Sequence, residues 1–233
     1  MFLHWHERLD YVYFIYGISF LLLGIVSLSI HKRGKAELDW RMLAAFGFLH
    51  GMREISDMIA WNLGDNSPFQ LFRSGLLAIS FLSLLEFGRA SLNGRSLVPG
   101  RWIHLVLTGG ALLVPLDNAG SLDAGIRYFL CIPAALIAGM GFLRQTRLAE
   151  FRDHRSLFFI GLAMFGYALG AGVIGPKTSY FPGSHLNDQS FTLVMGIPIQ
   201  IFRAALSILM CASLWNYQHN TEGVLLNERE KRQ

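Results

Sequence analysis

Charged side chains are scarce in this sequence. Only 15% of its 233 residues are Asp, Glu, Lys or Arg and 52% are hydrophobic, whereas an ordinary soluble domain carries roughly 25% charged residues. This composition excludes an ordinary soluble domain and indicates a membrane protein with lipid as its surroundings. The net charge is +4, but the basic residues flank apolar runs, as in cytoplasmic membrane loops, so we expect no nucleic-acid partner.

Cysteine and lysine are scarce too. Cys131 and Cys211 lie inside apolar stretches, where we expect neither a disulfide nor a thiolate metal site. No lysine lies within an apolar run, which excludes a retinal protein, because its Schiff base needs one. The sequence contains no P-loop, no Gly-x-Ser-x-Gly and no His-Glu-x-x-His motif, so we do not expect this chain to be an enzyme.

Apolar runs dominate what remains, and their lengths predict an all-α, polytopic membrane protein with seven transmembrane helices. The fourth run is the shortest, so a six-span topology is the chief alternative. The runs cover residues 11–30, 42–62, 69–88, 102–116, 124–143, 156–175 and 190–215.

The distribution of basic residues predicts the orientation. Arg and Lys gather between alternate runs, at 31–41, 89–101 and 144–155, and again after the last run. Only Arg8 and Lys177 lie in the other connecting segments. Because cytoplasmic loops are enriched in Lys and Arg, we expect a multi-pass protein with the N terminus outside and the C terminus in the cytoplasm.

The second run carries titratable groups at its centre. His50, Arg53, Glu54 and Asp57 recur at three- and four-residue spacing, so they share one face of a helix. A charged residue at the centre of a membrane helix costs roughly 2.5 to 3.5 kcal/mol on insertion scales. We therefore expect this face to point into the helix bundle.

Further polar residues within the runs are expected to meet that face. The last run contributes Gln200 and Arg203, and Arg73 and Arg127 lie near the outer ends of their own runs. Arg203 is too deep to reach the headgroups, so Glu54 or Asp57 is its expected partner. Two interpretations remain open: a salt-bridge network that fixes helix packing, or a site open to the outer face in which a surplus of arginines holds an anion.

Histidines raise the question of a metal or haem b. His50 alone lies deep, and His104 is the nearest candidate for a second axial ligand. His4, His6 and His185 lie on the predicted outer side and form an alternative site for copper, zinc or a haem. The cofactor therefore remains open: the chain binds haem b, a transition metal or no cofactor.

Glycine and proline predict how two of the helices pack and bend. Gly166 and Gly170 form a G-x-x-x-G pair in the sixth run, which favours close helix contact. Pro133 and Pro198 are expected to kink the fifth and seventh runs, because each removes a backbone donor.

A short motif in the second run, His50-Gly51-x-x-Glu54-x-x-Asp57, is followed by Ser80-Phe-Leu-Ser-Leu-Leu-Glu86-Phe-Gly-Arg89 at the end of the third. With these motifs and a charged C-terminal segment, the chain resembles the seven-helix membrane input domains of bacterial sensor histidine kinases and diguanylate cyclases. The resemblance implies a protein of the bacterial inner membrane, with a sensor domain at 1–215 and the start of an exit helix at 216–233. That helix would join a cytoplasmic output domain and form a homodimer.

Three functions follow from these patterns. The first is the input domain of a signal-transduction protein, which detects an anionic or amphipathic ligand, a proton or a redox cofactor through His50, Arg53, Glu54, Asp57 and Arg203. The second is a haem protein for redox or gas sensing or for electron transfer. The third is a small transporter or channel.

Overall fold

The chain folds into helices throughout the described residues. The computed structural model describes residues 8–32, 38–92, 100–115, 120–148 and 151–230, and only the backbone of 151–153 and 221–230. These residues form no β-strand, which confirms the all-α prediction. The helices are α2 (Leu9–Lys32), α3 (Trp40–Leu63), α4 (Ser67–Ser91), α5 (Trp102–Leu112), α6 (Ser121–Ile126), η1 (Arg127–Cys131), α7 (Ile132–Thr146), α8 (Phe151–Tyr167), η2 (Ala168–Val173), α9 (Asp188–Met195) and α10 (Ile199–Glu230), where η marks a π-helical segment.

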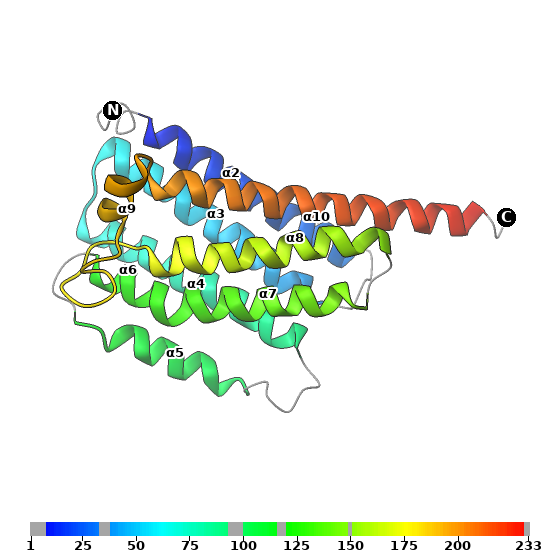
Figure 1. Cartoon of the computed structure of the whole chain (residues 1–233), viewed down its shortest axis with the longest axis horizontal. Helices are drawn as coiled ribbons and strands as arrows, with labels where there is room; N and C mark the ends of the chain where they lie inside the picture. Colours follow the sequence, from blue (N-terminus) through cyan, green and yellow to red (C-terminus); the bar gives the residue numbers. More distant parts are fainter. Residues whose placement is uncertain (1–7, 33–37, 93–99, 116–119, 149–150, 231–233) are drawn as a thin grey trace.

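Six long helical segments form a closed ring. α2 packs on α3, α3 on α4, α4 on α7, α7 on α8, α8 on α10, and α10 returns to α2. α5 lies outside this ring, against α6 and η1 (Figure 1). The short α9 lies near the start of α10, at the end of the ring where α2 also begins; we call this the α9 end.

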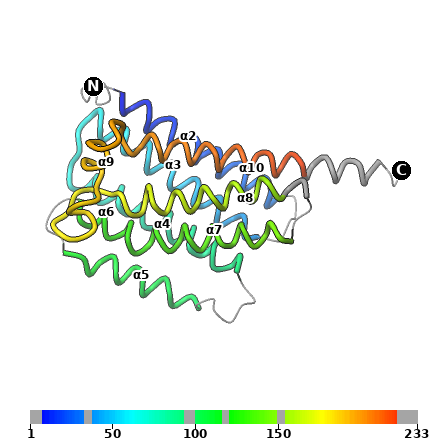
Figure 2. The backbone as a smooth tube through the Cα atoms, in the orientation of Figure 1, coloured from blue at the N-terminus to red at the C-terminus, as the bar shows by residue number. Residues whose placement is uncertain are grey.

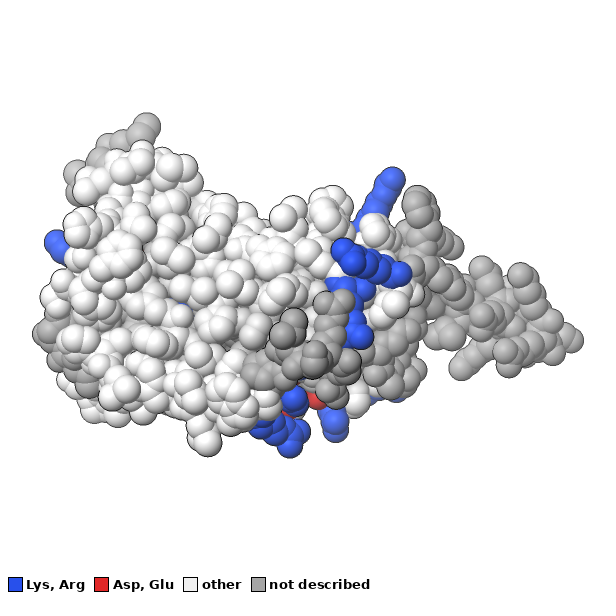
Figure 3. Space-filling view, turned by 60° about the horizontal axis from the view of Figure 1, so that its bottom comes forward, with Lys and Arg blue, Asp and Glu red and all other residues white. Residues whose placement is uncertain are grey.

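The described residues include five helical segments long and apolar enough to cross a membrane. These are 9–32, 67–91, 121–146, 154–173 and 199–220. Their outer faces expose large apolar side chains such as Leu22, Ile25 and Leu162, and Figure 3 shows a wide face without charged side chains. An apolar exterior around a partly polar interior indicates a membrane protein.

The remaining two of the seven predicted spans differ from these five. α3 has 24 residues, but its central polar groups lower its hydropathy. α5 has only 11 residues, which is about 16 Å of helix against a hydrocarbon core of about 30 Å. With its flanking residues α5 nevertheless leads the chain back toward the α9 end (Figure 1), so seven crossings remain a prediction.

Charged side chains are unevenly divided between the two ends of the ring. Arg8 and Lys177 lie at the α9 end, and the face in Figure 3 carries most of its Lys and Arg near the opposite end. The described basic residues at helix ends there are Lys32, Arg41, Arg89, Arg101, Arg144, Arg147 and Arg155. This asymmetry is the basis of the membrane orientation proposed below.

The two prolines act differently from one another. The seventh predicted run is not one kinked helix: α9 ends at Gly196, whose φ of 71° is left-handed, and α10 begins at Ile199 directly after Pro198. Glycine ends helices and proline precedes them readily, so Pro198 separates two helices. Pro133 instead lies just after the π-helical segment η1. Proline has no N–H for regular α-helical bonding, which accounts for the wider turn before it.

Close backbone contact occurs between α2 and α3. A Cβ atom added to Gly47 would lie 2.6 Å from the backbone nitrogen of Gly24, and one added to Gly51 would lie 2.8 Å from the carbonyl oxygen of Gly17. The two helices can therefore approach only because these positions lack side chains.

In the sixth run, close backbone approach occurs at Gly161, against Gly139 of α7, but not at the G-x-x-x-G pair. Gly166 lies against the side chain of Leu206, and Gly170 against the side chain of Phe202. These two glycines make room for apolar side chains of α10 rather than for its backbone.

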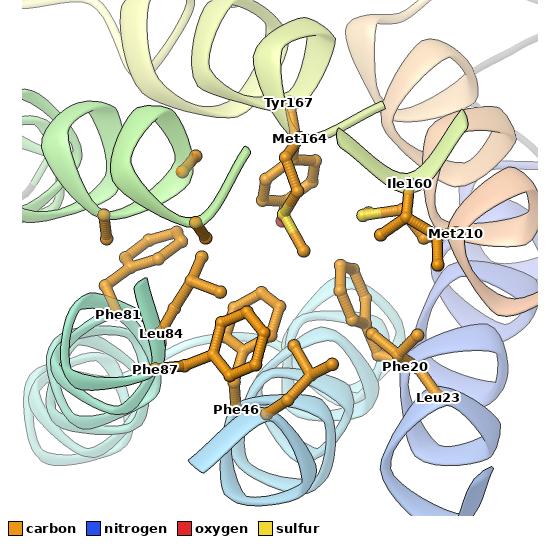
Figure 4. Close-up of a cluster of buried hydrophobic side chains, with 14 of the residues drawn as sticks. Phe20, Leu23, Phe46, Phe81, Leu84, Phe87, Ile160, Met164, Tyr167 and Met210 are labelled. Atoms are coloured by element: carbon orange, nitrogen blue, oxygen red, sulfur yellow. The ribbon is translucent and has the colours of Figure 1, made fainter. Parts of the chain in front are cut away.

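An apolar core fills the middle of the ring and the part nearer the end opposite α9. Figure 4 shows side chains from all around the ring pointing toward one another. Phe20, Phe46 and Phe81 are fully buried, and Trp40 packs against Phe87 further along. Polar side chains are concentrated on the other side of this layer, toward the α9 end.

Candidate functional site

The polar face of α3 points into the bundle, as its spacing predicts. His50, Arg53, Glu54 and Asp57 are all buried, with between 1% and 8% of each residue exposed. Trp61, which the same spacing places near that face, is 40% exposed at the end of the helix. The buried part of the face is therefore the central two turns.

An ion-pair network joins α3 to the starts of α4 and α6. Arg53 donates to Glu54 over 3.1 Å and also to Asp57. Its other terminal nitrogen lies 3.4 Å from Asp123, which accepts from Arg127 over 2.9 Å. These bonds place carboxylates and guanidinium groups of three helices in one buried cluster.

Arg73 extends the network to the surface at the α9 end. It donates to Asp57 and to Asp65, whose side chain is 38% exposed. Within the described residues, the buried Nε atoms of Arg53 and Arg73 and the Oε2 atom of Glu54 have no hydrogen-bond partner. Buried polar atoms are normally bonded, so the network retains capacity for further polar contacts.

Arg203 does not pair with Glu54 or Asp57, and that expectation is wrong. Its Nε donates to the carbonyl oxygen of Gly170 over 2.8 Å, and its Nη2 donates to the carbonyl oxygen of Ile174. The last carbonyls of a helix lack intrahelical donors and carry partial negative charge. The end of η2 therefore takes the place of the expected carboxylate.

Arg127 uses the same helix end. Its Nη1 donates to the carbonyl oxygen of Ala171 over 2.8 Å while its Nε holds Asp123. Two arginines from different helices thus complete the end of η2, which explains how Arg203 is accommodated here without a carboxylate partner.

A cavity of about 260 Å³ opens beside this cluster. Six of the eight predicted ligand-binding residues line it: Arg53, Asp57, Arg73, Arg127, Gln200 and Arg203. The other lining residues are Tyr13, Gln70, Ser74, Gly120, Asp123, Gly175, Pro176 and Asp188. No large apolar side chain is among them, so the cavity suits a small polar molecule.

His50 and Glu54 lie deeper than the cavity. His50 Nε2 is 3.4 Å from Glu54 Oε1 and 2.6 Å from the hydroxyl of Tyr167, which is 2.5 Å from the hydroxyl of Tyr16. His50 Nδ1 lies 3.0 Å from the hydroxyl of Ser80. A chain of polar groups thus runs from the cavity to the middle of the bundle.

The polar chain extends no deeper than His50 and the hydroxyl groups bonded to it. The His50 ring contacts Phe20, Phe46 and Phe81, with ring centroids 4.7, 5.3 and 5.2 Å away. Beyond them lies the apolar core of Figure 4. A channel needs polar groups or water along its whole length, and the described residues supply them over only part of the bundle.

The histidines are poorly placed for haem or metal. Both ring nitrogens of His50 already have protein partners, and His104 lies 3.4 Å from Glu86 near the opposite end. His185 Nδ1 bonds Ser184 on the surface, while His4 and His6 lie outside the described residues. No group of three His, Cys, Asp or Glu suited to a metal ion occurs in the described part of the chain.

Asp188 stands apart from the network although it lines the cavity. It is the first residue of α9, and its Oδ1 accepts from the backbone N–H of Gln189 over 2.8 Å. Burial raises the pKa of this carboxyl, while that backbone bond and the nearby Arg203 and Arg127 act in the opposite direction. It makes no ion pair within the described residues.

The sequence pattern missed several members of this site. Asp123 precedes Arg127 by four residues, a helical spacing that predicts their contact. Tyr16, Tyr167 and Asp188 lie far from α3 in the sequence, and no local pattern connects them to it.

Comparison of the chain with models of known protein families, with curated proteins and with solved structures gives no match.

Proposed function

We propose that this chain is the membrane-integral input domain of a bacterial signal-transduction protein. It senses a small polar ligand that enters the cavity from the outer side of the cytoplasmic membrane. The N terminus lies outside, the chain crosses seven times, and α10 leaves the membrane on the cytoplasmic side. The observation that carries the proposal is that Gln200 and Arg203, in the first turns of α10, line the cavity.

The length of α10 supports transmission from that cavity. The helix has 32 residues; Figures 1 and 2 show it running the length of the ring, and in Figure 1 it continues past the end. A displacement of its first turns is therefore transmitted along one continuous helix to the far end. We propose that this end forms a homodimer and leads to an output domain such as a histidine kinase or diguanylate cyclase.

Contacts at the start of α10 hold the helix in position and can be broken by a ligand. Arg203 holds α10 to the end of η2 through two carbonyls, and Gln200 donates to the hydroxyl of Tyr13 on α2 over 3.1 Å. A ligand that draws on the donors of Arg203 or Gln200 competes with these bonds. It shifts the position of α10 only to the extent that it binds one arrangement more tightly than the other.

A label on α10 tests this proposal. Asn216 is exposed on α10 just beyond the last predicted span, so Asn216→Cys in a Cys131→Ala, Cys211→Ala background gives a single water-accessible thiol for a fluorophore. In lipid nanodiscs, a ligand of the cavity is expected to change the emission saturably. Arg203→Gln is expected to abolish that change. A ligand that binds in the cavity without altering the emission of the label contradicts the sensor function.

A further inference from the structure

Seven charged side chains line the cavity, and five of them form one connected set. Arg53 and Arg73 share Asp57, and Arg53 and Arg127 share Asp123. Each guanidinium in this set faces at least one carboxylate, so the set has little need of a further ion.

The remaining two charges are of opposite sign. Within the described residues, Arg203 has no carboxylate partner and Asp188 has no cationic partner, although both line the same cavity. Arg203 uses Nε and Nη2 for backbone carbonyls, which leaves Nη1 without a described partner. Asp188 uses Oδ1 for its own helix, which leaves Oδ2 without one.

We propose that the ligand is a small zwitterion of the amino-acid class, whose carboxylate binds Arg203 and whose ammonium group binds Asp188. This inference rests on the proposed function and names the ligand class for the same cavity. A simple anion would satisfy Arg203 but would be repelled by Asp188, and a simple cation would have the reverse difficulty. A zwitterion satisfies both with charge-assisted hydrogen bonds.

The size and lining of the cavity agree with this ligand. A volume of about 260 Å³ is many times the roughly 10 to 15 Å³ that one water needs on this measure, enough for a compact amino acid. The hydroxyl groups of Tyr13 and Ser74 and the amide of Gln200 also reach the lining. An amphipathic ligand finds no large aliphatic side chain there to cover its tail.

Calorimetric titration of the full chain in lipid nanodiscs tests the ligand class. The probes are the common amino acids, and each that binds is compared with its hydroxy-acid and its amide, for example L-alanine with L-lactate and L-alaninamide. Each analogue lacks one charge, so we expect both to bind roughly 10- to 100-fold more weakly, the range for loss of a hydrogen bond to a charged group.

Variants at the two unpaired charges sharpen the test. Asp188→Asn keeps an oxygen for the Gln189 N–H and is expected to weaken amino-acid binding by the same factor while leaving hydroxy-acid binding unchanged or stronger. Arg203→Gln is expected to weaken the binding of both amino acids and hydroxy-acids. Because this variant also loses the bonds to the end of η2, Asp188→Asn, which keeps them, isolates the effect of a charge. Asp39→Asn, at the opposite end of the ring, is the matched control and is expected to have no effect.

The outcomes separate this inference from the proposed function. If hydroxy-acids or inorganic phosphate bind as tightly as amino acids and Asp188→Asn does not weaken binding, the ligand is an anion and the zwitterion is wrong, while the sensor function stands. If no amino acid binds, the inference is wrong as well. The sensor function fails separately, when a cavity ligand leaves the emission of the label at position 216 of α10 unchanged.

Discussion

The hydroxyl of Tyr167 lies 2.6 Å from Nε2 of His50, in the middle of the bundle. This bond joins α8 to α3 across the ring, and the same hydroxyl continues to Tyr16 on α2 over 2.5 Å. Three ring helices are therefore tied together by polar groups at the point where the apolar core begins. The arrangement fixes the end of the polar chain that starts at the cavity.

Removing the Tyr167 hydroxyl is expected to destabilise the protein. Tyr167→Phe leaves His50 Nε2 and the Tyr16 hydroxyl buried without this partner, and an unsatisfied buried polar group costs roughly 1 to 3 kcal/mol. Thermal unfolding in nanodiscs measures the effect. Tyr11→Phe is the control because Tyr11 is 67% exposed, and equal stability of the two variants contradicts a structural role for the bond.

Removing a carboxylate from the ion-pair network is expected to reduce stability much more in the buried part than at the outer end. Asp123→Asn leaves Arg127 and Arg53 under-compensated, and breaking a buried pair costs roughly 3 to 5 kcal/mol. Asp65→Asn removes a partner of Arg73 at the surface, where an ion pair is worth about 1 kcal/mol or less. Denaturation of the two variants under the same conditions measures the loss in free energy of unfolding of each. A larger loss for Asp65→Asn than for Asp123→Asn contradicts the prediction.

The α2–α3 contact predicts opposite effects for two Gly→Ala substitutions. Gly47→Ala places a methyl group 2.6 Å from the backbone of Gly24, and overpacking of this kind costs roughly 1 to 3 kcal/mol. Gly75→Ala in α4 has open space around the added methyl and is expected to be neutral or stabilising by up to about 1 kcal/mol. Unfolding midpoints measure both, and a neutral Gly47→Ala would show that the two helices are not in close contact.

Local periodicity was sufficient to predict where the polar face of α3 points. His50, Arg53, Glu54 and Asp57 recur at helical spacing, and the cost of exposing them to lipid leaves the interior as the only tolerable environment. The same reasoning identified six residues of the cavity lining. It works because each inference needs only one helix and the membrane around it.

The contacts between helices were beyond such reasoning. Arg203 was expected to meet a carboxylate, but the end of η2 offers carbonyl oxygens that no side-chain pattern reveals. Asp188 was not recognised as a site residue, because its place on the cavity wall depends on the break at Gly196 that separates α9 from α10. Hydropathy likewise merged these two helices into one run, since a left-handed glycine does not interrupt an apolar stretch.

The raised pKa of Asp188 gives ligand-free protein a definite pH dependence. The folded state holds the Asp188 proton at pH values at which the unfolded chain has released it. The contribution of this group to stability is therefore complete below its ordinary pKa of 3.8 and is lost as the pH rises through its raised value. Asp188→Asn is expected to remove this part of the stability profile, whereas Asp39→Asn is expected to keep it.

Binding of the proposed zwitterion is expected to depend on pH in the opposite direction. The ammonium group of the ligand pairs with the ionised form of Asp188, so affinity increases as the pH rises through the raised pKa of this carboxyl. Titrations at increasing pH, begun near the ordinary pKa of 3.8 and kept where the amino group of the ligand stays charged, follow this change. Wild-type protein is expected to show the slope and Asp188→Asn to lose it. If the variant retains the wild-type slope, another group on the cavity wall controls binding and Asp188 does not hold the ammonium.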